Sequence, residues 1–139
     1  MKKETAAREI ETLITRYPCL IPLRERLFRC VDLFAACYQS GGKLLICGNG
    51  GSAADSLHIV GELMKGFVLE RKISQSIQKT LIEQYPQEAS YYIQNLQTAV
   101  PAISLVSETA LTTAYSNDQA VDLAMAQQVL GYGCPGDVL

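Results

Sequence analysis

One short segment carries two groups of residues whose types and spacing suit chemistry. Glycines crowd residues 48–51, directly after the apolar run Lys43–Ile46 and just before Ser52, as expected where a strand turns into a helix. Backbone N–H groups at such a junction, with the helix N-terminus behind them, can cradle an anion, and the Ser52 hydroxyl could donate to an oxyanion. The simpler alternative is a tight turn in which Ser52 only caps the helix.

The second group is His58, the only histidine of the chain, and Glu62. Side chains four residues apart lie on one face of a helix. An imidazole and a carboxylate at that spacing can hold a divalent metal such as Zn²⁺, which also needs further ligands. Glu62 could alternatively be a general base that shifts a proton on a bound sugar. On spacing alone, an exposed polar pair without function is the more common arrangement.

A third candidate group is Asn117 and Asp118, which follow the second apolar strand. Their side chains could hydrogen-bond sugar hydroxyls. Residue type alone favours a turn that caps the next helix.

Nucleotide-binding motifs fit the glycine-rich segment poorly. A P-loop needs Lys-Ser or Lys-Thr after its glycines, and Ser52-Ala53 does not supply that pair. The looser dinucleotide fingerprint formally fits as Gly48-x-Gly50-x-x-Ala53, but no acidic residue ends a second strand within a compact βαβ unit. A generic nucleotide-binding βαβ domain is therefore the weakest of the functional hypotheses.

The bulk composition indicates one globular domain. Of the 139 residues, 48% are hydrophobic and 19% are charged, which is typical of a folded chain. A formal charge of −2 without a basic stripe argues against nucleic-acid binding, and no apolar run is long enough to span a bilayer. Five cysteines without a CxxC pair indicate a reduced, cytoplasmic chain.

Hydrophobic periodicity and breakers predict the order of the elements. An N-terminal helical part, 1–42, holds two helices separated by Pro18 and Pro22. The pattern then predicts a strand at 43–47, a helix at 52–65 with a Ser52–Asp55 capping box, and a polar insertion at 66–98 with two short helices. A second strand follows at 101–106, then a helical turn at 108–115 and a capping turn at 116–118. The last predicted elements are a helix at 119–130 and the start of a third strand at 136–139. Repeated β-α-β crossovers favour the α/β class with a parallel sheet, in which ligands bind beyond the carboxyl ends of the strands.

The packing face of the 52–65 helix is predicted from its small and apolar residues. These are Ala54, Leu57, Gly61 and Met64.

These motifs together resemble a known family. Segment 45–63, LICGNGGSAADSLHIVGEL, is similar to the signature of sugar isomerase (SIS) domain proteins of the phosphoheptose isomerase type, and 101–106, 115–118 and 136–139 are similar to its later landmarks, in the same order. The resemblance covers 1–139 as one partial SIS domain, apart from the 66–98 insertion. It implies a three-layer parallel sheet of the flavodoxin-like type with N-terminal helices, here lacking its last strands and its C-terminal helix.

The resemblance also implies a function. Members interconvert sedoheptulose 7-phosphate and a heptose 7-phosphate through an enediol. By position, the residues that would bind substrate are Asn49, Gly50, Gly51, Ser52, Asn117 and Asp118. His58 and Glu62 would ligate zinc, and Glu62 would also move the proton. Members are homotetramers, so self-association is expected.

Two departures from the family qualify this expectation: the family's C-terminal segments are missing, and 66–98 is inserted. The family's serine- and threonine-rich phosphate loop, and a glutamine and a second histidine from its C-terminal helix, have no counterpart in these 139 residues. We therefore expect an incomplete copy of the domain that is inactive by itself. The alternative is a non-catalytic, sugar-phosphate-binding regulatory SIS module, a class that includes partners of the replication initiator. The insertion could be a lid or an oligomer contact.

Overall fold

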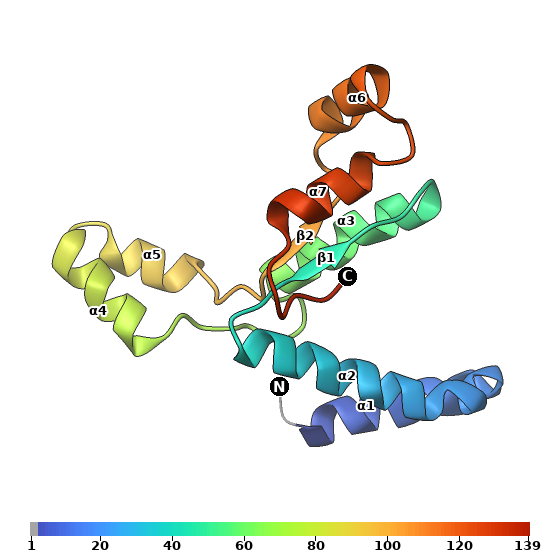
Figure 1. The fold of residues 1–139 in the computed structure, drawn as a ribbon. Helices are drawn as coiled ribbons and strands as arrows, with labels where there is room; N and C mark the ends of the chain where they lie inside the picture. The colour runs from blue at the N-terminus through green and yellow to red at the C-terminus, as the bar shows by residue number, and fades with distance from the viewer. Residues whose placement is uncertain (1–2) are drawn as a thin grey trace.

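The N-terminal part of the chain is a pair of packed helices (Figure 1). The computed structural model describes residues 3–139, and in this first part the elements are, in order, α1 (Lys3–Arg16), the 3-10 helix η1 (Pro18–Leu23) and α2 (Arg24–Gln39). Ala6, Ile10 and Ile14 of α1 are buried. Both predicted helices are confirmed, and the prolines that were expected to separate them lie in η1.

The sheet is parallel and is centred on β1 (Leu44–Ile46). On one side β1 pairs with β2 (Ala102–Ser104). On the other side the Leu45 N–H donates to the Val138 carbonyl at 2.8 Å, and Val138 makes a single parallel bridge. The predicted α/β class with a parallel sheet is confirmed, and the strand expected at 136–139 is present as this one bridge.

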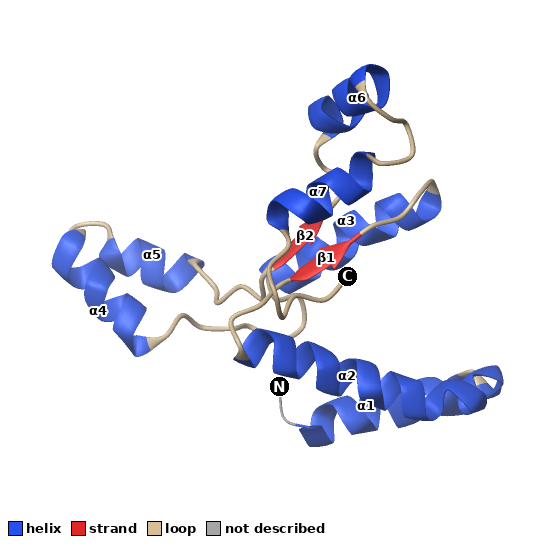
Figure 2. Cartoon of the chain, viewed as in Figure 1, coloured by secondary structure: helices blue, strands red, loops and turns tan. Residues whose placement is uncertain are grey.

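Helices follow each strand and extend from the sheet (Figure 2). Their bounds are α3 (Gly51–Met64), α4 (Gln75–Gln84), α5 (Ala89–Asn95), α6 (Thr109–Asp118) and α7 (Ala124–Tyr132). α3 packs against β2, α4 packs on α5, and α6 packs on α7. The two helices predicted within 66–98 are α4 and α5, and they form a pair that projects away from the sheet (Figure 1). Among the helices of residues 3–139, none combines the length and the hydrophobicity that a bilayer crossing needs.

The start of α3 differs from the predicted capping box. The N-cap residue is Gly50, with φ of 54°, and its position receives no side-chain hydrogen bond. Ser52 lies inside the first turn, where its N–H donates to the Asn49 carbonyl at 3.1 Å. The prediction that Ser52 caps the helix is wrong because the glycines let the backbone turn earlier than a Ser cap requires.

The buried face of α3 also differs from the prediction. Leu57 and Met64 are about half exposed, at 49% and 47%. The buried residue of α3 is Ser56, whose Oγ lies 2.7 Å from the Ser104 Oγ of β2 and also donates to the Ala53 carbonyl at 2.7 Å. A buried hydroxyl is tolerated when it is hydrogen-bonded, so a polar contact joins this helix to the sheet.

The segment after β2 is more helical than predicted. α6 continues through Asp118, so 116–118 is its last turn and not a separate turn that caps α7. The chain reverses after Gln119, whose backbone leaves the helical region, and α7 begins only at Ala124. α7 is joined to the sheet by the buried Gln128, whose Nε2 donates to the Leu105 carbonyl at 2.8 Å.

An ion pair fastens the amino-terminal end of β1. The Asp137 carboxylate accepts from the Lys43 Nζ at 2.6 Å, from the Lys43 N–H at 2.9 Å and from the Cys134 N–H at 2.7 Å. Its hydrogen bond with the Lys43 side chain is the first cause that lowers the pKa of Asp137 to about 2. The Asp137 side chain is only 7% exposed, so this contact ties the third strand segment to the start of the sheet.

Candidate functional site

The glycine-rich turn between β1 and α3 depends on close backbone approach. A side chain at Gly48 would place its Cβ 2.5 Å from the Ser52 carbonyl oxygen, so only glycine fits there. Gly50 has a positive φ that other residues rarely adopt. Within residues 3–139, the N–H groups of Asn49, Gly50 and Gly51 donate no hydrogen bond, and all three residues are exposed. The turn therefore presents backbone donors outward, as an anion or a sugar oxygen requires.

His58 and Glu62 lie on α3 beyond this turn, both exposed. With a helical rise of about 1.5 Å per residue, His58 is about 10 Å and Glu62 about 16 Å along the axis from Gly51. The glycine turn and the pair thus share one rigid element, as predicted, and a ligand that touches both must be elongated. A sugar phosphate has such a shape.

The metal-binding capacity of this face is partial. Imidazole and carboxylate are suitable zinc ligands, and the pair supplies one of each. Among residues 3–139, no group of three or more His, Cys, Asp or Glu side chains is arranged to hold a metal ion. Any zinc held by His58 and Glu62 would need its other ligands from outside this pair.

Asn117 and Asp118 occupy the last turn of α6, where both are exposed. The Asn117 Nδ2 donates to the Asp118 Oδ1 at 3.0 Å. Since α6 and the glycine turn each follow the carboxyl end of a paired parallel strand, they lie at the same end of the sheet (Figure 1). No hydrogen bond within residues 3–139 joins Asn117 or Asp118 to α3.

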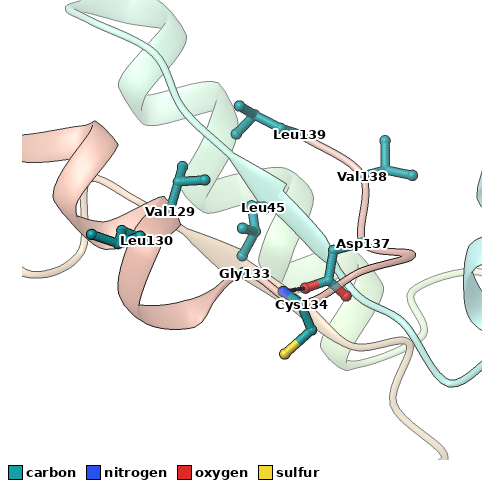
Figure 3. Close-up of a pocket in the computed structure, with 8 residues that line it drawn as sticks. All are labelled: Leu45, Val129, Leu130, Gly133, Cys134, Asp137, Val138 and Leu139. Atoms are coloured by element: carbon teal, nitrogen blue, oxygen red, sulfur yellow. Dashed lines mark hydrogen bonds between the residues drawn. The ribbon is translucent and has the colours of Figure 1, made fainter.

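Two hollows of the surface lie away from these residues. One of about 340 Å³ is formed mainly by apolar residues of β1, α7 and the C-terminal segment, with the Asp137 carboxylate and the Cys134 N–H at its edge (Figure 3). A second of about 300 Å³ is lined by Cys47, Leu105, Met125, Ala126, Val129 and Leu139. None of the predicted site residues lines either of these two hollows, and all of them are exposed.

Sequence reasoning missed the residues that hold this surface in place. Ser56 and Gln128 are each about 1% exposed and bond α3 and α7 to the sheet. The Arg71 guanidinium bonds the last turn of α3. Serine, glutamine and arginine are usually exposed, and nothing in their spacing separates these three from surface residues.

Comparison with known proteins decides the family. The sequence pattern described as the SIS domain matches residues 22–107. The chain belongs to the SIS domain family.

Relatives of this SIS domain are named phosphoheptose isomerase. The protein of that name from Synechocystis sp. is 36% identical over 109 residues, covering 78% of this chain and 43% of its own length. That from Roseiflexus sp. is 34% identical over 128 residues, covering 92% of this chain and 48% of its own. The structure of phosphoheptose isomerase GmhA from Neisseria gonorrhoeae superposes with a TM-score of 0.57 at 25% identity, covering 98% of this chain and 52% of that one.

Two facts limit how much of the relatives' function can be inferred for this SIS domain. The chain spans about half the length of the curated relatives it matches. Residues 22–107 include the glycine turn, the His58–Glu62 pair and β2, whereas Asn117 and Asp118 lie beyond them.

Proposed function

We propose that this chain carries part of the active site of a sugar-phosphate aldose–ketose isomerase that interconverts sedoheptulose 7-phosphate and a heptose 7-phosphate. The observation that carries the proposal is the placement of unbonded backbone donors and the His58–Glu62 pair on one helix of a SIS domain. The names of the relatives support the substrate.

Each candidate residue has a role in this proposal. The N–H groups of Asn49, Gly50 and Gly51, with the Ser52 hydroxyl, bind sugar oxygens. Asn117 and Asp118, on α6 at the same end of the sheet, bind sugar hydroxyls.

Glu62 moves the proton. Its carboxylate takes the proton from C1 of the ketose, the C1–H electron pair forms the C1=C2 bond of the enediol, and O2 receives a proton from an acid. Glu62 then returns its proton to C2, while O1 loses its proton and becomes the aldehyde oxygen. A second imidazole that could protonate O2 is not among the 139 residues, where His58 is the only histidine.

Zinc is part of the proposal. His58 and Glu62 would hold the ion, and bound Zn²⁺ would polarise the sugar carbonyl as a Lewis acid. Because two ligands hold zinc only weakly and a second imidazole is missing from the sequence, we expect the 139-residue chain alone to show little net isomerisation.

The cellular location and the oligomeric state of the enzyme are also part of the proposal. All five cysteines are unpaired in the structure, which suits a reducing cytoplasm. Large apolar side chains are exposed on the N-terminal helices, which supports assembly with further copies into a homotetramer; they are Leu13, Tyr17, Ile21, Leu23 and Leu33.

The test separates proton abstraction from complete isomerisation. With sedoheptulose 7-phosphate in D₂O, NMR would follow deuterium entering C1, which reports enediol formation even when little aldose is released. We expect wash-in with the wild-type chain and a loss of about 10²–10⁴-fold in Glu62→Gln. Binding of the sugar phosphate, measured by calorimetry, should remain within a few fold. Glu83→Gln removes an exposed carboxylate of α4 and is the matched control.

Each outcome decides between the hypotheses. Binding of the sugar phosphate without wash-in by the wild-type chain would overturn proton abstraction by these 139 residues, and it is the result that the non-catalytic regulatory module predicts. Absence of both would overturn the sugar-phosphate proposal, and wash-in retained by Glu62→Gln would exclude Glu62 as the base.

A further inference from the structure

The segment 66–98, called the arm from here on, is attached to the rest of the chain by a closed root. Lys72 and Gln97 form an antiparallel bridge. The Thr98 N–H donates to the Arg71 carbonyl at 2.7 Å, and the Thr98 Oγ1 donates to the Lys72 carbonyl at 2.9 Å. The two chain segments that enter and leave the arm are therefore bonded to each other, so the arm does not hang on two independent linkers.

One side chain organises the entry into this root. The Gln97 Oε1 accepts from the Gly66 N–H at 3.1 Å and from the Arg71 N–H at 3.4 Å. A Cβ at Gly66 would lie 2.9 Å from that Oε1 and 2.2 Å from the Leu69 carbonyl oxygen. The backbone after α3 is thus folded tightly around the Gln97 side chain.

Arg71 connects the root to the last turn of α3. Its Nη2 donates to the Leu63 carbonyl at 2.7 Å and to the Glu62 carbonyl at 3.2 Å. The Leu63 carbonyl also accepts from the Val100 N–H, at 2.8 Å, just before β2. The final carbonyls of a helix lack partners within the helix and carry partial negative charge, so a guanidinium there satisfies both needs.

The burial of Arg71 indicates that these bonds determine its position. Its Nε is buried and has no hydrogen-bond partner, an arrangement that costs free energy. The side chain is held there nonetheless, with its Nη2 on two carbonyls. Lysine would offer a compact ammonium on a flexible stem in place of the rigid, planar guanidinium.

We propose that Arg71 is a positioning residue for proton transfer, which fixes the last turn of α3 and thereby the backbone of Glu62, and that it couples this turn to the arm. The inference rests on the proposed function, because Glu62 is the base there. It also assigns a role to the arm, because the root of the arm helps to hold the last turn of α3 in place. A displacement of about 1 Å in a reacting group can reduce the rate about 100-fold, so loosening this turn should be visible in the rate.

The experiment compares Arg71→Gln with Lys79→Gln, which removes the same charge from an exposed position on α4. Three quantities are measured: amide hydrogen exchange over 61–65, the saturated rate of deuterium wash-in at C1, and the affinity for sedoheptulose 7-phosphate. For Arg71→Gln we expect exchange over 61–65 to be about tenfold faster and wash-in to be at least about tenfold slower. The affinity should change less than about twofold, because the glycine turn lies at the other end of α3.

Arg71→Lys keeps the charge and N–H donors but replaces the planar guanidinium with an ammonium on a flexible stem, so its exchange and wash-in rates should lie between those of the wild type and Arg71→Gln. This variant serves if Arg71→Gln fails to fold. Faster exchange in Arg71→Gln with unchanged wash-in would make Arg71 merely structural and overturn the proposal, as would no change in either. Absence of wash-in from the wild-type chain would instead be a failure of the proposed function.

Discussion

The two ends of α3 are built in opposite ways. At its start, the N–H groups of Asn49, Gly50 and Gly51 donate no hydrogen bond within residues 3–139 and face solvent. At its end, the Leu63 carbonyl accepts two hydrogen bonds, one from Arg71 and one from Val100. One helix is therefore open at the turn proposed to bind substrate and fastened at the turn that carries the proposed base.

The strand before α3 shows the same division. β1 begins beside the part-buried Lys43–Asp137 ion pair and ends in the exposed glycine turn. Backbone donors that are free to bind a ligand do not stabilise the fold, so other contacts must hold the element that carries them. The difference teaches that the β1–α3 unit concentrates its stabilising bonds away from its proposed binding end.

Breaking the open end should have the largest effect on binding. Gly48→Ala would bring a Cβ within 2.5 Å of the Ser52 carbonyl oxygen, which is backbone and cannot swing aside. We expect the turn to rebuild and sedoheptulose 7-phosphate to bind at least about tenfold more weakly, which corresponds to about 1.4 kcal/mol. Calorimetric titration measures this.

The matched substitution on the same helix is Gly61→Ala. A Cβ there meets nothing within 4 Å, and alanine is favoured over glycine inside a helix by about 0.5–1 kcal/mol. Sugar-phosphate affinity should be unchanged and the free energy of unfolding slightly higher. Equal weakening by both alanines would remove the steric argument for the turn.

Breaking the ion pair at the start of β1 should affect stability without affecting binding. Asp137→Asn keeps the shape of the side chain but removes the charge that Lys43 contacts at 2.6 Å. We expect a lower Tm at pH 7 and an unchanged affinity for the sugar phosphate. Asp122→Asn, at an exposed position, is the control and should leave the Tm unaltered.

The pH dependence of stability sharpens this prediction. The pKa of Asp137 is lowered from 3.8 to about 2 in the folded chain. A depressed pKa adds stability that is complete above the unfolded value and is lost as the pH falls toward the folded one. The wild-type Tm should therefore decline between pH 5 and pH 2 more steeply than the Asp137→Asn Tm. Parallel curves would show that the ion pair contributes nothing.

Much of the fold could be predicted because its signals are local. The apolar run at 43–47 and the glycines after it place β1 and α3 to within about one residue, and the prolines at 18 and 22 separate the first two helices. The parallel sheet follows from the β-α-β order. The glycine turn and the i, i+4 pair of the site are equally local, so the structure has both on one element.

The rest could not be predicted because it depends on contacts between distant segments. Ser56 meets Ser104 across 48 residues, and the Gly66 N–H meets Gln97 across 31. The pattern of apolar residues pointed to Leu57 as buried, whereas the structure buries a serine beside it. The path of α6, which decides where Asn117 lies, is set by its packing on α7 and not by the turn propensity of its last residues.

The last comparison concerns the middle of α3, at the Ser56–Ser104 contact between its two ends. The two hydroxyls have unequal alternatives: the Ser56 Oγ keeps a bond to the Ala53 carbonyl when Ser104 is replaced, whereas the Ser104 Oγ loses its recorded partner when Ser56 is replaced. A buried polar group left without a partner costs about 1–3 kcal/mol, and a lost bond between satisfied groups about 0.5–1.5 kcal/mol. Ser56→Ala should therefore destabilise more than Ser104→Ala, and the double variant less than the sum of the two. Urea unfolding of the three variants measures the order. A strictly additive cycle would mean that the hydroxyl pair does not join α3 to the sheet.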